Sequence, residues 1–202
     1  NAVGLGSPDR EVRVPPAAKP SPAATPTAIS LLHGKVTKVD SGDAFTALIT
    51  DGSTERVRLV GIDAPDPDQV WGDKSYFALA ALLNGKDVVI RFRGRDAYGR
   101  ILGRVIADGK DVGLTQLTNG NAWYMKADAP QLTPPARKLY PAAEASAKKN
   151  RIGLWADPAP VSPWDFRKGT GASELKTFEE KSEVKQPDGF FGRVTSIFSA
   201  KS

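Results

Sequence analysis

One segment predicts a β-strand that ends in an acidic corner: Arg56-Val-Arg-Leu-Val-Gly-Ile-Asp-Ala-Pro-Asp66. Val57 and Leu59 alternate with arginines, and this period of two is typical of a strand packed on one face. We therefore predict a strand over residues 56–62, with Arg58 inside it.

The corner itself carries three carboxylates and two prolines. Asp63, Asp66 and Asp68 are separated by Pro65 and Pro67. Because proline fixes its backbone and lacks an N–H, the strand cannot continue through this corner. A strand that carries an arginine into a rigid acidic corner can hold a cation and a phosphate side by side.

Short apolar runs separated by turn residues predict four more strands, over residues 30–39, 45–50, 88–92 and 100–107. The first three strands lie within about thirty residues, joined by turns such as Asp51-Gly-Ser. This tight spacing favours a small closed barrel over a parallel sheet.

Three helices are predicted: over residues 70–84, after a capping Asp111, and over residues 141–150. Proline is tolerated only in the first turn of a helix, so Pro141 places the last start near Tyr140 rather than Pro134. The predicted fold class is α+β, mainly β: a five-stranded OB-fold barrel with three helices.

A length of 202 residues with 40% hydrophobic content suits one ordinary domain, which we place at residues 30–168. Residues 1–29 are rich in proline and alanine and predict a disordered linker. Residues 169–202 are predicted to form a polar linker followed by a short amphipathic tail. The polar composition of this linker already begins at Arg167. In that tail, residues 189–202 place apolar side chains on one face. The favoured interpretation is a terminal helix that docks on its own domain or is left frayed, and contact with a membrane surface or a partner is the alternative.

The chain has no cysteine and one histidine, His33. Thiolate chemistry, cysteine-ligated zinc and mechanisms that need two histidines are therefore excluded. Any hydrolytic chemistry must come from carboxylates, arginines and a hard cation bound through oxygen.

The net charge of +5 and a pI near 9.4 permit a polyanionic partner without requiring one.

No apolar run is long enough to predict a transmembrane segment. The chain begins at Asn1, and together with the proline-rich linker this leads us to expect a secreted or cell-envelope protein. We expect a monomer.

Four charged positions lie where predicted strands end: Asp43, Arg58, Asp63 and Arg100. In a five-stranded barrel these ends can meet on one rim. Two carboxylates there would form a Ca²⁺ or Mg²⁺ site, and two arginines would clamp a phosphate. Asp66 is the remaining carboxylate that can activate a water. Taken singly, each is also an ordinary turn or strand residue.

The order of these motifs resembles the staphylococcal nuclease family over about residues 33–168. The matching elements are Val39-Asp-Ser-Gly-Asp43, Arg58-Leu-Val-Gly-Ile-Asp63-Ala-Pro-Asp66, Asp96-Ala-Tyr-Gly-Arg100, Gly120-Asn-Ala-Trp123 and Ala142-Ala-Glu-Ala-Ser-Ala-Lys-Lys-Asn-Arg-Ile-Gly-Leu-Trp155. The resemblance implies an OB-fold enzyme that cleaves DNA and RNA with calcium (Ca²⁺) and leaves 3′-phosphate ends.

The resemblance also implies a role for each matching residue. Asp43 and Asp63 would be Ca²⁺ ligands, with the backbone carbonyl of Ala64 as a third. The other implied roles are phosphate binding and transition-state stabilisation by Arg58 and Arg100, general base or water orientation by Asp66, and packing against the nucleotide by Tyr98.

Three positions depart from the family pattern. Ser41 stands where a supporting aspartate is usual, and Ala64 replaces a common threonine. Asp66 replaces a glutamate and is one methylene shorter, a displacement expected to cost about a hundredfold in rate. A backbone shift, or a contribution from Asp68, would compensate.

Two functions remain open. The first is a Ca²⁺-dependent, sugar-nonspecific nuclease, and the second is a catalytically degenerate barrel that binds nucleic acid or a protein. Tudor-associated members with a similar Ser-Gly-Asp-Ala element illustrate the second. Retention of both Arg58 and Arg100 favours catalysis, since a binding module needs positive charge but not at those two places.

Overall fold

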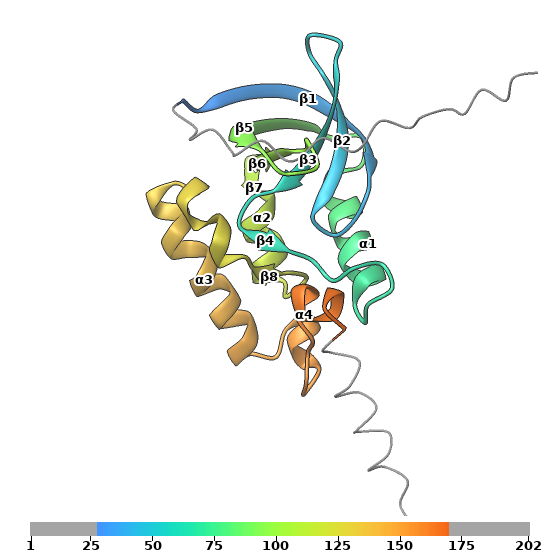
Figure 1. The fold of residues 1–202 in the computed structure, drawn as a ribbon, viewed down its shortest axis with the longest axis vertical. Helices are drawn as coiled ribbons and strands as arrows, with labels where there is room; N and C mark the ends of the chain where they lie inside the picture. The colour runs from blue at the N-terminus through green and yellow to red at the C-terminus, as the bar shows by residue number, and fades with distance from the viewer. Residues whose placement is uncertain (1–27, 170–202) are drawn as a thin grey trace, which may run out of the picture.

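The computed structural model describes residues 28–169, and its strands form a closed barrel (Figure 1). The bounds of the sheet strands are β1 Ser30–Val39, β2 Ala44–Ile49, β3 Thr54–Leu59, β5 Asp87–Arg95, β6 Ile101–Ala107 and β7 Lys110–Asp111. The strands pair in the order β3-β2-β1-β5-β6-β7, and a parallel pairing of β3 with β6 closes the ring. Since β7 is a two-residue strand that pairs only with the end of β6 and takes no part in closing the ring, the predicted five-stranded barrel is confirmed.

The predicted strand over residues 56–62 is wrong beyond Leu59. Gly61 has a φ of 81°, a left-handed conformation that glycine adopts without steric cost. The chain turns there and then forms β4, Ile62–Asp63, which pairs with β8, Trp123–Tyr124. This turn takes the acidic corner out of the barrel ladder and points it toward the helices.

The helical segments are α1 Gly72–Leu83, α2 Val112–Thr118, η1 Lys126–Gln131, α3 Pro134–Lys149, η2 Gly153–Ala156 and α4 Pro163–Arg167. Figure 1 shows α1, α3 and α4 beyond the end of the barrel from which β4 leaves. Asp111 caps α2 as predicted, because its carboxylate accepts a hydrogen bond from the Leu114 N–H at 3.1 Å.

The predicted start of the last long helix near Tyr140 is wrong. Two prolines, Pro134 and Pro135, occupy the first turn of α3, and Pro141 lies in its interior. An interior proline costs about 3 kcal/mol or more, since one helical hydrogen bond is lost. Tyr140, which is fully buried and donates a hydrogen bond to Asp111 at 2.8 Å, helps to offset that cost.

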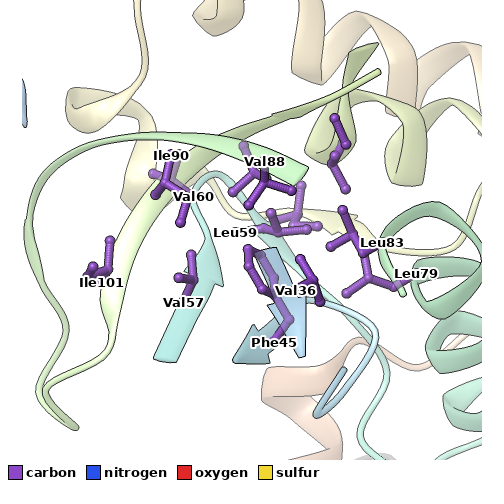
Figure 2. Close-up of a cluster of buried hydrophobic side chains, with 14 of the residues drawn as sticks. Val36, Phe45, Val57, Leu59, Val60, Leu79, Leu83, Val88, Ile90 and Ile101 are labelled. Carbon is purple, nitrogen blue, oxygen red and sulfur yellow. The ribbon is translucent and has the colours of Figure 1, made fainter. Parts of the chain in front are cut away.

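The core fills the barrel and continues into α1. Figure 2 shows Leu79 and Leu83 of α1 on the side of the cluster where Phe45 and Val36 of the barrel lie. Burying a side chain of this size stabilises the fold by about 1.5–3 kcal/mol. The alternating pattern of the strands therefore closes the barrel around one apolar interior, and the charged side chains are left to its rim.

Several terminal predictions fall outside the described residues. They concern residues 1–27 of the linker predicted over residues 1–29, and everything after residue 169, including the tail 189–202. Arg167, predicted to lie in a polar linker, is instead the last residue of α4. Within residues 28–169, no helix has both the length and the apolar character needed to cross a membrane.

Candidate active site

A cavity of about 490 Å³ lies at the rim of the barrel. Its lining includes every site residue predicted from the sequence: Asp43, Arg58, Asp63, Ala64, Asp66, Tyr98 and Arg100. These residues come from the turn before β2, from β3, from β4 and the loop after it, and from the turn between β5 and β6. The barrel thus brings distant segments to one place, and Arg167 of α4 joins them.

Buried contacts fix the backbone beside Asp43. A side chain at Gly42 would place its Cβ only 2.0 Å from the Ser75 hydroxyl oxygen, so only glycine fits this close approach. The fully buried Gln116 side chain donates to the Gly42 carbonyl at 2.9 Å. Asp43 accepts a hydrogen bond from the Ser41 hydroxyl at 2.7 Å. Ser41, which stands where the family has an aspartate, therefore supports Asp43 as a donor.

Arg58 is held by three acceptors. Its Nε lies 3.4 Å from Asp43 Oδ2, one terminal nitrogen lies 3.3 Å from Asp128, and the other donates to the Ile62 carbonyl at 2.9 Å. Burial opposes its charge, but the carboxylates of Asp43 and Asp128 raise the pKa of Arg58 above its ordinary value. A guanidinium has five N–H donors, so two remain for a ligand in the cavity.

Asp128 is a residue of this site that the sequence did not indicate. It lies in η1, 70 residues after Arg58, and its Oδ2 also accepts from the Gly61 N–H at 3.1 Å. One carboxylate thus holds both the arginine and the turn that redirects the chain after β3. Nothing in its local sequence distinguishes it from an ordinary surface aspartate.

Arg100 is held differently from Arg58. Its Nε donates to Asp96 at 2.7 Å, but neither terminal nitrogen has a hydrogen-bond partner among residues 28–169. The ring of Tyr98 is 83% exposed, and its centroid lies 5.4 Å from the Arg100 Cζ. Arg100 therefore presents a free pair of terminal nitrogens beside an exposed aromatic ring.

Asp63 is a buried carboxylate, only 4% exposed. Burial raises the pKa of Asp63, and the negative charge of Asp43 acts in the same direction, while the hydrogen bonds from Arg167 oppose both. Asp43 and Asp63 line the same cavity, so their like charges repel each other there. A cation between them would relieve that repulsion.

Arg167 is the second site residue that the sequence did not indicate. Its NH2 lies 2.5 Å from Asp63 Oδ2, and its NH1 lies 3.1 Å from Asp66 Oδ1. The sequence signal that could have indicated α4 is its capping pattern, in which Ser162 precedes Pro163. In the structure the Ser162 hydroxyl accepts a hydrogen bond from the Asp165 N–H at 3.3 Å. Such a pattern predicts a helix but not its partner.

The Asp66 side chain is 31% exposed, more than those of Asp43 and Asp63. The Asp66 backbone N–H donates to the side-chain oxygen of Gln69 at 3.2 Å. The side-chain nitrogen of Gln69 in turn donates to the Val161 carbonyl at 2.6 Å. Asp68 lines a neighbouring apolar pocket and not this cavity. Asp66 is therefore the carboxylate that faces the cavity from this loop.

The candidate cation donors are all oxygens: the two carboxylates of Asp43 and Asp63, and the backbone carbonyl of Ala64. In the part of the chain that is described, no group of three or more histidine, aspartate or glutamate side chains is placed to hold a metal. Two buried, mutually repelling carboxylates still fit a hard cation that keeps several waters, as Ca²⁺ and Mg²⁺ do.

The barrel and its cavity define an OB-type domain with acidic and basic side chains on one rim. Comparison with known proteins agrees, because the family description "Staphylococcal nuclease homologue" matches residues 56–157. A protein named uncharacterized endonuclease from Escherichia coli is 36% identical over 137 residues, covering 67% of this chain and 85% of that protein. A micrococcal nuclease from Shigella flexneri is 34% identical over 147 residues, covering 68% and 82%.

The chain therefore belongs to the staphylococcal nuclease family. A further relative, an uncharacterized endonuclease from Haemophilus influenzae, is 33% identical over 134 residues, covering 66% of this chain and 72% of that protein. The predicted enzyme class, a nuclease, is confirmed by these relatives.

Proposed function

We propose that this protein is a Ca²⁺-dependent, sugar-nonspecific nuclease that hydrolyses phosphodiester bonds of DNA and RNA. The observation that carries the proposal is the meeting of two buried carboxylates and two arginines in one cavity. The printed names of the relatives, endonuclease and micrococcal nuclease, support the same activity.

In this proposal Asp43, Asp63 and the Ala64 carbonyl would hold the cation. When bound, Ca²⁺ would withdraw charge from a phosphate oxygen and orient a water. Arg100 would bind two phosphate oxygens through its free terminal nitrogens, which is the bidentate geometry that a guanidinium favours. Arg58 would add its two remaining N–H donors as negative charge grows on the phosphate.

Asp66 is the proposed acceptor of a proton from the attacking water. Both of its carboxylate oxygens lie within 3.2 Å of Arg167 NH1, so the proton must be accepted at a lone pair that this contact does not use. Its side chain is also one methylene shorter than glutamate. We therefore expect slow chemistry, reduced by about a hundredfold from a well-placed base.

The contact between Arg167 and both carboxylate oxygens of Asp66 favours a second candidate function, a barrel that binds nucleic acid without cleaving it. In that case the arginines would bind phosphates, and the paired carboxylates would act only in folding. The exposed ring of Tyr98 beside Arg100 suits either candidate, since it offers a stacking surface for a base.

A cleavage assay separates the two candidates. Single-stranded DNA is incubated with the protein in Ca²⁺ and then with a chelator, alongside Arg100→Ala. Arg93→Ala is the matched control, because Arg93 lies on the same hairpin, in β5, is exposed and does not line the cavity. We expect cleavage that needs Ca²⁺ and falls about 10²–10³-fold in Arg100→Ala, with Arg93→Ala close to wild type. Binding without cleavage would support the second candidate.

A further inference from the structure

The C-terminal segment of the described chain is fastened beside the cavity. The side chain of Gln69 donates a hydrogen bond to the carbonyl of Val161 in this segment. The ring of Trp164 packs edge-on against the ring of Trp123, with centroids 5.6 Å apart. Ser162 caps the short helix that follows. These contacts place Arg167, the last residue of α4, at the rim.

The guanidinium of Arg167 contacts both oxygens of both neighbouring carboxylates. Its NH2 lies 2.5 Å from Asp63 Oδ2, and its NH1 lies 3.4 Å from Asp63 Oδ1. The same NH1 lies 3.1 and 3.2 Å from the two oxygens of Asp66. A bidentate guanidinium on Asp63 occupies the oxygen atoms that a cation would need.

The other charges of the cavity already have partners. Asp43 pairs with Arg58, which also pairs with Asp128, and Arg100 pairs with Asp96. Among the described residues, Arg167 is the one basic side chain that forms an ion pair with Asp63. It is also the one that links Asp63 to Asp66.

We infer that Arg167 is a positioning residue that serves as the built-in counter-ion of Asp63 and Asp66 and competes with the divalent cation for Asp63. It holds the two carboxylates together before the cation binds and releases Asp63 when the cation arrives, while it can keep Asp66. This inference rests on the proposed cation site. The side chain of Arg167 is 46% exposed and the arriving cation would replace its charge beside the buried Asp63, so Arg167 can leave Asp63 at modest cost.

Calorimetric titration with Ca²⁺ alone tests this competition without measuring activity. Arg167→Gln removes a positive charge next to the cation site, so the Kd for Ca²⁺ should fall about tenfold. Lys168→Gln is the matched control, with the same change of charge one residue further on, at a side chain that pairs with Asp165 and not with Asp63 or Asp66. Its Kd should equal that of wild type.

A second variant guards against loss of structure. Arg167→Lys keeps the charge, but one ammonium cannot reproduce the two-armed contact, so its Kd should lie between those of wild type and Arg167→Gln. Thermal unfolding of each variant verifies that it is folded. An equal or higher Kd in folded Arg167→Gln would overturn the inference and leave the proposed nuclease standing. Absence of Ca²⁺ binding in wild type and variants alike would overturn both.

Discussion

The two sides of the cavity are built by different means. The barrel side carries Asp43 and Arg58, whose side chains are 11% and 13% exposed and are held by part-buried hydrogen bonds. The C-terminal side carries Asp66 and Arg167, whose side chains are 31% and 46% exposed and are joined mainly by ion pairs. The barrel therefore fixes one half of the site and leaves the other half adjustable.

The difference has a physical basis. Removing one partner of a buried charge pair leaves an uncompensated charge in a poorly solvated place, which is strongly destabilising. An exposed pair loses little, because water solvates the charge that remains. Substitutions on the barrel side should therefore reduce the stability of the fold, whereas substitutions on the C-terminal side should change the chemistry and leave the fold intact.

The largest effect is expected from Arg58→Ala. The change leaves Asp43 and Asp128 without their buried partner, so the free energy of unfolding should fall by about 3–5 kcal/mol. Urea denaturation measures it. Arg95→Ala, which breaks the more exposed pair with Glu55, should cost no more than about 1 kcal/mol. Equal losses in the two variants would remove the distinction between the two sides.

Asp66→Glu should change activity without changing stability. The longer side chain restores the reach of a glutamate, and cleavage of single-stranded DNA should rise by up to about a hundredfold. Asp68→Glu is the matched control, since Asp68 lines the neighbouring pocket. A decrease in Asp66→Glu would mean that the adjustable side has been rebuilt around the shorter carboxylate.

The sequence predicted the barrel because its information is local. Alternation placed the strands, and turn residues such as Asp51-Gly-Ser separated them. Asp111 marked the start of a helix. The interior position of Pro141 could not be predicted in this way, because the burial of Tyr140 outweighs the local preference of proline.

For the site, the sequence indicated the residues whose spacing resembles the family. It did not indicate Asp128 or Arg167, because each meets its partner only through the fold. Arg167 lies 104 residues after Asp63, and their contact depends on where α4 packs. The turn at Gly61 was missed for a related reason, since the apolar alternation runs on through it.

Tyr140→Phe extends the comparison to a buried contact away from the cavity, between α3 and the start of α2. Losing the hydrogen bond to Asp111 should cost about 1 kcal/mol at pH 7. Burial and the negative charge of Asp111 raise the pKa of Tyr140, so the folded chain keeps this proton where the unfolded chain loses it, near pH 10. Wild type should therefore lose stability as pH rises above about 10, and its advantage over Tyr140→Phe should shrink.

Denaturation of both proteins between pH 7 and 11 checks this expectation. Tyr98→Phe serves as the control, because the ring of Tyr98 is exposed and its hydroxyl has no hydrogen-bond partner among the described residues. A constant difference between wild type and Tyr140→Phe across this range would contradict the proposed role of the buried hydroxyl.

A smaller loss of stability than that of Arg58→Ala is expected from Arg167→Gln. Arg167 is half exposed and Asp66 stays in contact with water, but Asp63 is buried and keeps only the nearby charge of Arg58, so the free energy of unfolding should fall by about 1–2 kcal/mol. Urea denaturation alongside Arg58→Ala gives the comparison directly. A loss as large as that of Arg58→Ala would show that both sides of the cavity are fixed parts of the fold.

A crystal structure with Ca²⁺ and a dinucleotide carrying a non-hydrolysable phosphate linkage gives the decisive test of the proposed site. We expect the cation on Asp43 and Asp63, and the phosphate on the terminal nitrogens of Arg100 with Arg58 nearby. A cation bound elsewhere, or a phosphate bound away from both arginines, would contradict it.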